Sequence, residues 1–316
     1  MEHTNKIACV VGPTACGKTT LGILLAQRFG GEIVSADSMQ IYRGMAIGTA
    51  APTAEEMALA PHHMVGVADP QETYSAACFV EDASACVDDI LARGKLPIVV
   101  GGTGLYLDAL VAGRSFAAGG SETRSRQRLG ERLAREGIEP LYRELAIIDP
   151  AAAARLHLRD EKRSLRALEI YYETGQTITE HDAQRKLLPP RYDAVYIGLT
   201  FEDRADLRAL IDARVDAMLS QGLVEEVRAL LSAGVSPSST ALQAIGYKEL
   251  LGALRGEKSL AEATEEIKLR SRQYAKRQLT WLRRNKAIHW IFWKKERDFP
   301  RALQLSTEIL SAHGLG

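Results

Sequence analysis

The chain has 316 residues, of which 46% are hydrophobic, and its 40 basic and 40 acidic residues leave a formal net charge of zero. This length allows one large domain or two linked domains. The balanced charge excludes a uniformly basic coat for nucleic acid, although a clustered basic surface stays possible. The four cysteines show no C-x-x-C pair or metal-ligand spacing, and no long apolar stretch opens the chain. We therefore expect reduced thiols, no membrane span and a cytoplasmic location.

The N-terminal part alternates short apolar runs with helical periodicity. A strand at 6–11 leads through a glycine-rich turn into a helix at 18–29, and a second strand is expected at 31–37. A helix at 75–94 lies between a Ser start and a Gly stop, and residues 96–113 repeat the order strand, glycine turn, helix. This alternation predicts a parallel sheet that binds ligands at the carboxyl ends of its strands.

The composition changes near residue 115, where helical segments without a convincing strand begin. A buried strand is expected to return at 194–200, before further helices, a long basic helix at 260–285, and a last strand and helix. We therefore predict an α/β fold with a P-loop NTPase-like core and a parallel sheet. Its core would comprise residues 1–114 and 192–316, with an all-helical insertion domain at 115–191.

Residues 12–19 read GPTACGKT and fit the phosphate-binding pattern G-x-x-x-x-G-K-[ST]. Glycines let backbone N–H groups turn inward, and the following helix presents its positive N-terminus to an anion. Lys18 would add a full charge, Thr19 a hydroxyl for Mg²⁺, and Cys16 would fill the loop. The predicted diphosphate- or nucleotide-binding residues are Gly12, Pro13, Thr14, Ala15, Cys16, Gly17, Lys18 and Thr19.

The phosphate-binding loop does not specify a reaction. A kinase of this class needs an acid at the end of a core strand, yet the apolar run before Gly101 ends in the sequence GGTG. Asp37, at the end of the second expected strand, could bind Mg²⁺ or accept a proton. These residues alone leave both roles open.

Six motifs follow one another between Val10 and about Trp290: GPTACGKT, SADSMQIYRGMAIGTA, PHHMV, DPQETYSAACF, GGTGLYLDALVAG and RQYAKRQLTWLR. Together they resemble the bacterial tRNA dimethylallyltransferase family. The resemblance implies that a dimethylallyl group passes from dimethylallyl diphosphate to N6 of the adenosine adjacent to the anticodon, with release of diphosphate. It also implies Mg²⁺, the tRNA anticodon stem-loop as partner, and an inserted helical domain that contacts it. We expect a monomer.

By this resemblance, Asp37 is the general base for the N6 proton and Thr103 lies at the reacting centre. Lys18, the loop amides and Mg²⁺ would stabilise the leaving diphosphate, and Arg228 could also reach it. From the residues alone, Asp37 could instead be a turn residue, Thr103 a helix cap and Arg228 part of an ordinary surface helix.

RNA contacts are expected because a base in a folded loop must be extruded and held. The helix at 260–285 interleaves cations with Tyr274 and Trp281; we expect it both to pack on the core and to contact RNA. Gln40 is our candidate reader of a neighbouring adenine. By the same resemblance, the expected tRNA-binding residues are Asp37, Ser38, Met39, Gln40, Thr103, Arg124, Lys162, Arg163, Ser164, Leu165, Arg166, Gln243, Ala244, Ile245, Gly246, Tyr247, Lys248, Arg272, Lys276, Arg277 and Gln278.

Three rival functions share this core: an adenylate isopentenyltransferase acting on free AMP or ADP, a P-loop small-molecule kinase, and a non-catalytic RNA-binding protein. The helical insertion and the basic helix favour tRNA, because a mononucleotide would need neither. His62 and His63 lack ligand partners at metal spacing and are predicted to be structural.

Overall fold

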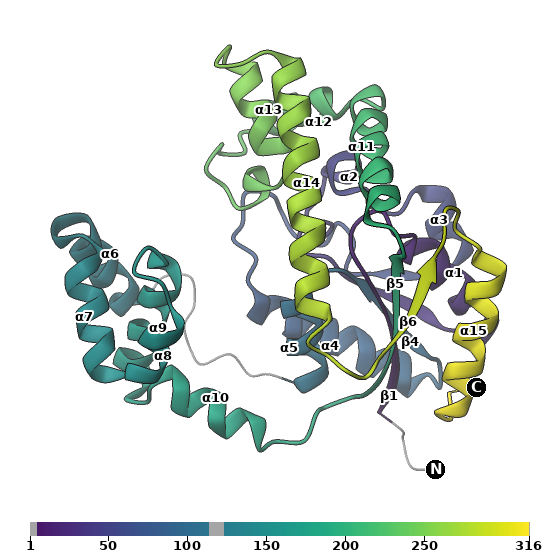
Figure 1. Ribbon diagram of the computed structural model, residues 1–316, viewed down its shortest axis with the longest axis horizontal. Coiled ribbons are helices and arrows are strands. Elements are labelled where there is room, and N and C mark those ends of the chain that lie inside the picture. Colours follow the sequence, from purple (N-terminus) through teal and green to yellow (C-terminus); the bar gives the residue numbers. More distant parts are fainter. Residues whose placement is uncertain (1–4, 114–122, 316) are drawn as a thin grey trace. The chain divides into compact units, whose positions relative to one another are not determined.

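The computed structural model describes residues 5–113 and 123–315, apart from the side chains of residues 185 and 186. The expected domain junction at 114–115 lies outside the described residues. Contacts divide the chain into two compact units, one formed by residues 1–113 and 191–316 and the other by residues 114–190 (Figure 1). Each unit is described by itself.

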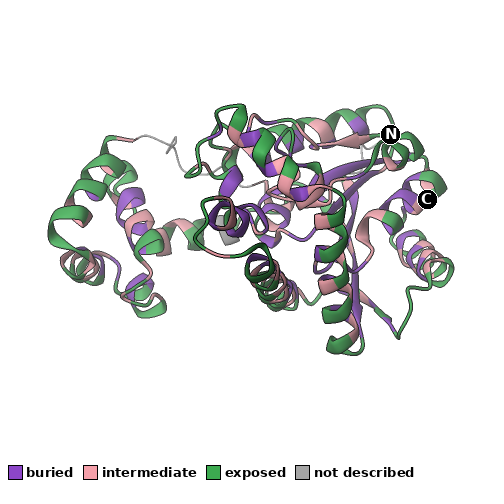
Figure 2. Cartoon of the chain, turned by 90° about the horizontal axis from the view of Figure 1, so that it is seen from above, coloured by how far each residue is buried: buried purple, intermediate pink, exposed green. Residues whose placement is uncertain are grey.

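The larger unit is built on a six-stranded sheet in the order β3-β2-β4-β1-β5-β6, in which every neighbouring pair is parallel. Its apolar strands are buried on both faces, as a parallel sheet requires, and they form the buried centre of this unit in Figure 2. The predicted parallel α/β sheet is confirmed. The strands are β1 (Lys6–Val11), β2 (Glu32–Ala36), β3 (His62–His63), β4 (Pro97–Gly101), β5 (Asp193–Phe201) and β6 (Ile288–Trp293).

Helices cover both faces of this sheet. Helices α1 (Lys18–Phe29) and α15 (Phe299–Ala312) pack together on one face, and α4 (Ala76–Ala92) and α5 (Gly104–Ala112) on the other (Figure 1). The α1 side closes over a continuous apolar core that includes Val10 and Ile197. This arrangement leaves the carboxyl ends of the central strands as the edge where polar loops converge.

A group of helices stands beyond that edge and has an apolar core of its own (Figure 1). The long helix α14 packs against both α11 and α13. The group comprises α11 (Arg204–Ser220), α12 (Leu223–Ser232), the 3₁₀ turn η1 (Ala241–Gln243), α13 (Tyr247–Leu254) and α14 (Leu260–Leu282). Of two short helices, α2 (Ala46–Thr49) packs against α12 and α3 (Ala54–Leu59) packs against α1. The sequence pattern had not indicated α2, α3 or the two-residue strand β3, because all are too short to show a period.

The smaller unit contains only helices among its described residues. Its core is formed by Leu129, Leu141 and Leu145 with residues of α9. The buried Asp149 caps α8 through the N–H of Ala152. The helices are α6 (Arg124–Glu136), α7 (Ile138–Ile148), α8 (Pro150–Arg155), α9 (Glu161–Thr174) and α10 (Ile178–Lys186).

Two further expectations concern the chain as a whole. Across the described ranges, no helix combines the length and the apolar character needed to cross a membrane. All four cysteines carry free thiols, and Cys9 and Cys16 are buried.

Candidate active site

A cavity of about 740 Å³ opens in the larger unit at the carboxyl ends of β1, β2 and β4. Its walls come from the turn after β1, the segments at 37–40 and 46–53, helix α11, the turn at 243–246 and helix α14. Strand β1 lies between β4 and β5, so the order of the sheet reverses beside this cavity. Such a reversal is where open α/β sheets bind ligands.

The turn after β1 is a preformed anion cradle. Ala15 and Gly17 both have left-handed backbone conformations, with φ of 64° and 89°, and α1 begins at Lys18 directly after them. The N–H groups of the first helical turn have no partner within the helix and point at the space where an anion would lie. Lys18 Nζ donates to Pro13 O at 2.8 Å, so its charge stays beside the loop.

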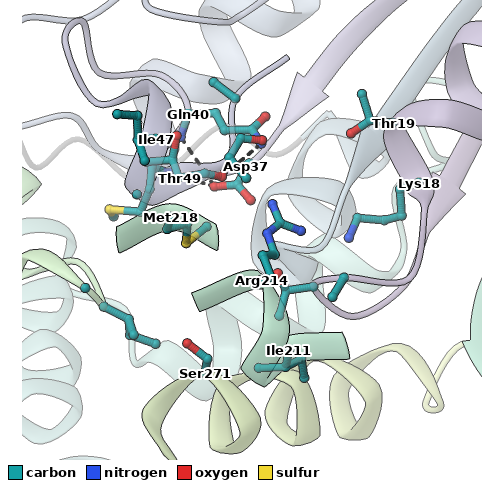
Figure 3. A pocket seen from close by; sticks show the side chains of 18 of the residues that line it. Lys18, Thr19, Asp37, Gln40, Ile47, Thr49, Ile211, Arg214, Met218 and Ser271 are labelled. Atoms are coloured by element: carbon teal, nitrogen blue, oxygen red, sulfur yellow. Dashed lines mark hydrogen bonds between the residues drawn. The ribbon is translucent and has the colours of Figure 1, made fainter. Parts of the chain in front are cut away.

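Positive charge dominates this cavity. Lys18, Arg214, Arg277 and Arg297 line it, and no acid within the described ranges forms a salt bridge with any of them. Burial lowers the pKa of Arg214, opposed chiefly by the charge of the Asp37 carboxylate. Figure 3 shows Lys18, Arg214 and Asp37 around the same space. A cavity with several unpaired cations suits a ligand with several negative charges.

Asp37 follows β2 directly and faces the cavity (Figure 3). Its Oδ1 accepts hydrogen bonds from the N–H of Met39 at 2.9 Å and, at 3.4 Å, from that of Gln40. These bonds show that Asp37 stabilises a turn, as one of the alternatives from the sequence predicted, and they fix the plane of its carboxylate. Its Oδ2 has no hydrogen-bond partner in the described part of the chain, so one oxygen is held while the other is available to a ligand.

Thr103 stands at the start of α5, but its side chain does not cap that helix. Instead its Oγ1 accepts from the Ser38 N–H at 3.2 Å and lies 3.5 Å from the Ser38 hydroxyl. Tyr274 lies next to it: burial and the Asp37 charge raise the pKa of this phenol to about 12, while interactions with Thr103 and Gln278 oppose the rise. The helix-cap alternative for Thr103 is therefore wrong, and its hydroxyl links the Asp37 turn to the turn after β4.

The Gln40 side chain is held by hydrogen bonds within the protein and is not free to contact a base. Its Oε1 accepts from the Ser35 hydroxyl at 2.9 Å, and its Nε2 donates to Thr49 O and Ala50 O. Both amide protons are thereby used by the protein, so the carboxamide cannot make a two-pronged contact with an adenine in this arrangement. The expectation that Gln40 reads a neighbouring base is not supported, because the side chain holds the 46–51 wall of the cavity.

The same wall is fixed from its other side by Glu226 of α12. The Glu226 carboxylate accepts hydrogen bonds from the N–H groups of Ile47 and Gly48, at 2.8 and 3.0 Å, and from the Tyr247 hydroxyl at 2.5 Å. A Cβ added to Gly48 would lie 2.4 Å from the Tyr247 ring, so only glycine fits there. Tyr247 is fully buried, and this excludes the RNA contact expected of it.

The predicted diphosphate residues divide into three groups. Thr14, Ala15, Gly17, Lys18 and Thr19 line the cavity. Gly12, Pro13 and Cys16 support the loop from beneath: burial raises the pKa of the Cys16 thiol, and the Cys16 carbonyl accepts from Trp293 Nε1 at 2.8 Å. Arg228 is not among the lining residues; its exposed guanidinium pairs with Glu225, which favours the surface-helix alternative.

The predicted tRNA-binding residues of the larger unit also differ in their surroundings: some are exposed, one is paired with an acid, and others line the cavity. Lys276 and Arg277 are exposed on α14, and Lys248 is exposed on α13. Arg272 forms two 2.6 Å hydrogen bonds with the Asp212 carboxylate, which removes it from the open set. Those that line the cavity are Asp37, Ser38, Met39, Gln40, Gln243, Ala244, Ile245, Gly246, Arg277 and Gln278.

In the smaller unit, the predicted tRNA residues have unequal access to solvent. Arg124, Lys162 and Arg163 are exposed. Ser164 is fully buried, and Leu165 packs against the helical core. Burial therefore excludes Ser164 from RNA contact and turns Leu165 toward packing. Arg166 pairs with the buried Glu169.

Sequence reasoning missed Arg214, Arg297 and Glu226. Arg214 is one of three arginines on α11, and nothing in the sequence separates it from Arg204 or Arg208. A polar residue between Ile211 and Val215, both of which line the cavity, was the one available signal. Glu226 is one of two adjacent acids and only its fold neighbours distinguish it.

These features define a class of protein: an α/β P-loop protein whose phosphate loop shares a cationic cavity with one strand-end carboxylate. Comparison with known proteins defines the family. The model of the IPP transferase family matches residues 40–285, and an isopentenyl transferase model matches residues 5–61. The chain belongs to the IPP transferase family, and the resemblance carried by the six motifs is confirmed.

Relatives match along almost the whole chain. The tRNA dimethylallyltransferase of Geobacter metallireducens is 47% identical over 94% of this chain and 96% of its own length, and that of Pelotomaculum thermopropionicum is 45% identical over 98% of both. A crystal structure of the Bacillus halodurans tRNA isopentenylpyrophosphate transferase is 39% identical, with a TM-score of 0.73 over 98% and 96% of the two chains. A structure of a eukaryotic dimethylallyltransferase acting on tRNA is 31% identical, with a TM-score of 0.83 over 97% and 80%.

Proposed function

We propose that this protein transfers the dimethylallyl group of dimethylallyl diphosphate to N6 of the adenosine adjacent to the anticodon of tRNA. The observation that carries the proposal is that Lys18, Arg214 and Asp37 line one cavity. Within the described residues, neither Lys18 nor Arg214 forms a salt bridge with an acid. Relatives that match nearly the full chain are named for this activity.

The reaction requires a nucleophile, a leaving group and a proton acceptor. The adenine N6 attacks C1 of the dimethylallyl group, the bond between C1 and the diphosphate oxygen breaks, and the N6 proton passes to Asp37. An exocyclic adenine amine is weakly nucleophilic because its lone pair is delocalised, so a carboxylate that takes the proton as the bond forms lowers the barrier. The hydrogen bonds from Met39 and Gln40 to Oδ1 leave Oδ2 for this task.

The leaving diphosphate gains negative charge as the bond breaks. Lys18, Arg214 and the amides at the start of α1 are positioned to bind that charge, and fixed donors of this kind stabilise a transition state without reorganisation. Thr103 would hold the Asp37 turn through Ser38 rather than touch the diphosphate.

Mg²⁺ is proposed as the accompanying cation. No cluster of three or more His, Cys, Asp or Glu side chains suited to a metal occurs among the described residues, whereas the Thr19 hydroxyl lines the cavity beside the loop. This donor set fits a Mg²⁺ ion that takes most of its oxygens from diphosphate and water. The ion would supply charge neutralisation to the departing diphosphate.

The acceptor side of the cavity would receive an extruded base, with the anticodon loop tracking over exposed cations. Lys276 and Arg277 of α14 and Lys248 of α13 are the exposed candidates in the larger unit. In the smaller unit Arg124, Lys162 and Arg163 are exposed, and we propose that residues 114–190 bind the stem-loop backbone. Phosphate contacts of this kind position RNA without reading its sequence.

The decisive experiment incubates the purified protein with dimethylallyl diphosphate, Mg²⁺ and an unmodified anticodon stem-loop, and analyses the nucleosides by mass. We expect a prenylated adenosine, and no product from a matched stem-loop that carries guanosine at that position. AMP and ADP serve as alternative acceptors in parallel. Prenylation of the mononucleotides alone, or release of ADP from ATP without prenyl transfer, would refute the proposal in favour of one of the two rival enzymes.

A further inference from the structure

Helix α14 presents Tyr274, Gln278 and Trp281 to the two glycine-rich turns of the cavity. These residues are spaced four and three apart and therefore lie on one stripe of the helix. Trp281 Nε1 donates to Asp108 of α5 at 2.9 Å, and a Cβ added to Gly104 would lie 2.1 Å from the Trp281 ring. The stripe is thus packed against the turn after β4.

The Gln278 side chain extends from α14 to the phosphate loop. Its Oε1 accepts a hydrogen bond from the backbone N–H of Thr14 at 2.9 Å. Only 5% of the residue is exposed. The position also depends on Gly102, because a Cβ there would lie 2.2 Å from Gln278 Nε2. The side chain therefore fills a slot between the two turns and touches the backbone of both.

The phosphate loop has a second long-range tie on its other side. Trp293 of β6 donates to the carbonyl of Cys16 at 2.8 Å in the buried interior. Thr14 and Cys16 lie on either side of Ala15, the non-glycine residue of the loop that has a left-handed backbone conformation. Two side chains from distant parts of the chain consequently fix the segment in which the backbone reverses, just before the amides that face the cavity.

We propose that Gln278 is a positioning residue for the diphosphate loop and not an RNA contact. It acts through Thr14: with its N–H satisfied by Gln278, the loop keeps the backbone conformation that aims the amides from Gly17 onward at the diphosphate. Loss of the acceptor leaves a part-buried N–H unsatisfied, and such a group is costly enough to shift the loop. The inference rests on the proposed function, because it assumes that this loop binds the donor diphosphate.

Helix α14 has a buried face and an exposed face, and one sequence motif contains residues of both. Gln278 and Lys276 stand two residues apart in RQYAKRQLTWLR, but Lys276 is exposed whereas Gln278 is buried. Residues two apart on a helix do not share a face. We therefore expect Lys276 to affect RNA binding and Gln278 to affect donor binding.

The test compares Gln278→Met, which keeps the volume but removes the acceptor, with Lys276→Met as the matched variant on the exposed face. Binding of inorganic pyrophosphate with Mg²⁺ is measured by calorimetry in the absence of RNA, and KM is measured for dimethylallyl diphosphate and for the stem-loop. We expect Gln278→Met to weaken pyrophosphate binding about tenfold and to raise the donor KM in parallel. Lys276→Met should leave pyrophosphate binding unchanged and raise the RNA KM.

Gly102→Ala provides an independent disturbance of the same slot, because its methyl group would displace the Gln278 carboxamide. It should also weaken pyrophosphate binding, and it serves in place of Gln278→Met if that variant does not fold. An unchanged pyrophosphate Kd in these variants, with a raised KM for RNA, overturns the inference. A wild-type protein that fails to bind pyrophosphate would instead overturn the proposed function itself.

Discussion

Strand β2 has a carboxylate at each end, and the two have opposite surroundings. Glu32, at its start, is buried and bonded to Arg93, Lys95 and His63. Asp37, just past its end, has one oxygen tied to its own turn and the other open to a cavity. Two carboxylates five positions apart in the sequence therefore differ: the protein itself uses all of Glu32, whereas Asp37 is available to a ligand.

The cations follow the same division. Those around Glu32 are paired with it, while Lys18 and Arg214 lie at the opposite edge of the sheet without an acidic partner among the described residues. Satisfied charges stabilise a fold only by a net margin, since their desolvation offsets much of the attraction. Unpaired charges held in a cavity stabilise nothing until a ligand arrives. Charge pairing thus distinguishes the amino ends of these strands, where the charges are paired, from their carboxyl ends, where we propose that the reaction takes place.

The largest expected effect comes from Asp37→Asn. The amide keeps an oxygen for the Met39 and Gln40 N–H groups but cannot accept the N6 proton. We expect kcat to fall by about 10²- to 10⁴-fold, with donor binding and the melting temperature close to wild type. Single-turnover prenylation of the stem-loop measures this loss. A kcat within threefold of wild type would remove Asp37 from the role of general base.

Arg214→Gln should be nearly as severe, with a loss of about 10²- to 10³-fold in kcat/KM for dimethylallyl diphosphate. The exposed Arg208 on the same helix supplies the matched control, Arg208→Gln, and Arg228→Gln tests the arginine that the sequence had suggested for the diphosphate site. Both controls should retain activity within about twofold, because neither lines the cavity. If Arg228→Gln is the damaging change, the assignment of the diphosphate site is wrong.

Glu32→Gln should reverse the pattern, with stability lost and kcat retained. Its hydrogen bonds to Arg93, Lys95 and His63 hold the pKa of Glu32 well below its usual range. We expect a loss of about 2–4 kcal/mol in the free energy of unfolding at neutral pH, measured by denaturant titration. Asp89→Asn, which alters only the exposed partner of Arg93, should cost below about 1 kcal/mol.

The pH dependence of this loss has a defined sign. A carboxyl whose folded pKa is depressed contributes stability above its unfolded pKa of about 4.3, and the contribution disappears as the pH falls below that value. The wild-type protein and Glu32→Gln should therefore differ most between pH 5 and about 7 and converge under more acidic conditions. Equal differences at every pH would show that packing, not charge, accounts for the loss.

The smallest effect of these main substitutions is expected for Tyr247→Phe, which should change both stability and activity slightly. It removes the hydrogen bond to Glu226 but keeps the ring against Gly48. We expect a loss of about 1 kcal/mol in stability and a few-fold fall in kcat/KM for RNA, because the 46–51 wall loosens. An effect on donor binding without any fall in kcat/KM for RNA would contradict this prediction.

The local features of this protein could be predicted from the sequence alone. The phosphate loop, the strand ending at Asp37 and the parallel α/β pattern are properties of short segments, so periodicity and motif spacing predict them. The six motifs together also identified the family. The same reasoning gave the helical character of the described residues of 114–190, because every amphipathic segment there has the helical period.

Tertiary structure alone decided which side chains are open to a ligand. Tyr247, Arg272 and Gln278 share motifs with residues that face the cavity or solvent, yet each forms a hydrogen bond with a residue at least 21 positions away in the sequence. Arg214 became a candidate only when α11 was placed opposite Asp37. A motif records which residues occur together, whereas availability depends on burial and on hydrogen bonds between distant segments, and only the folded chain brings those segments together.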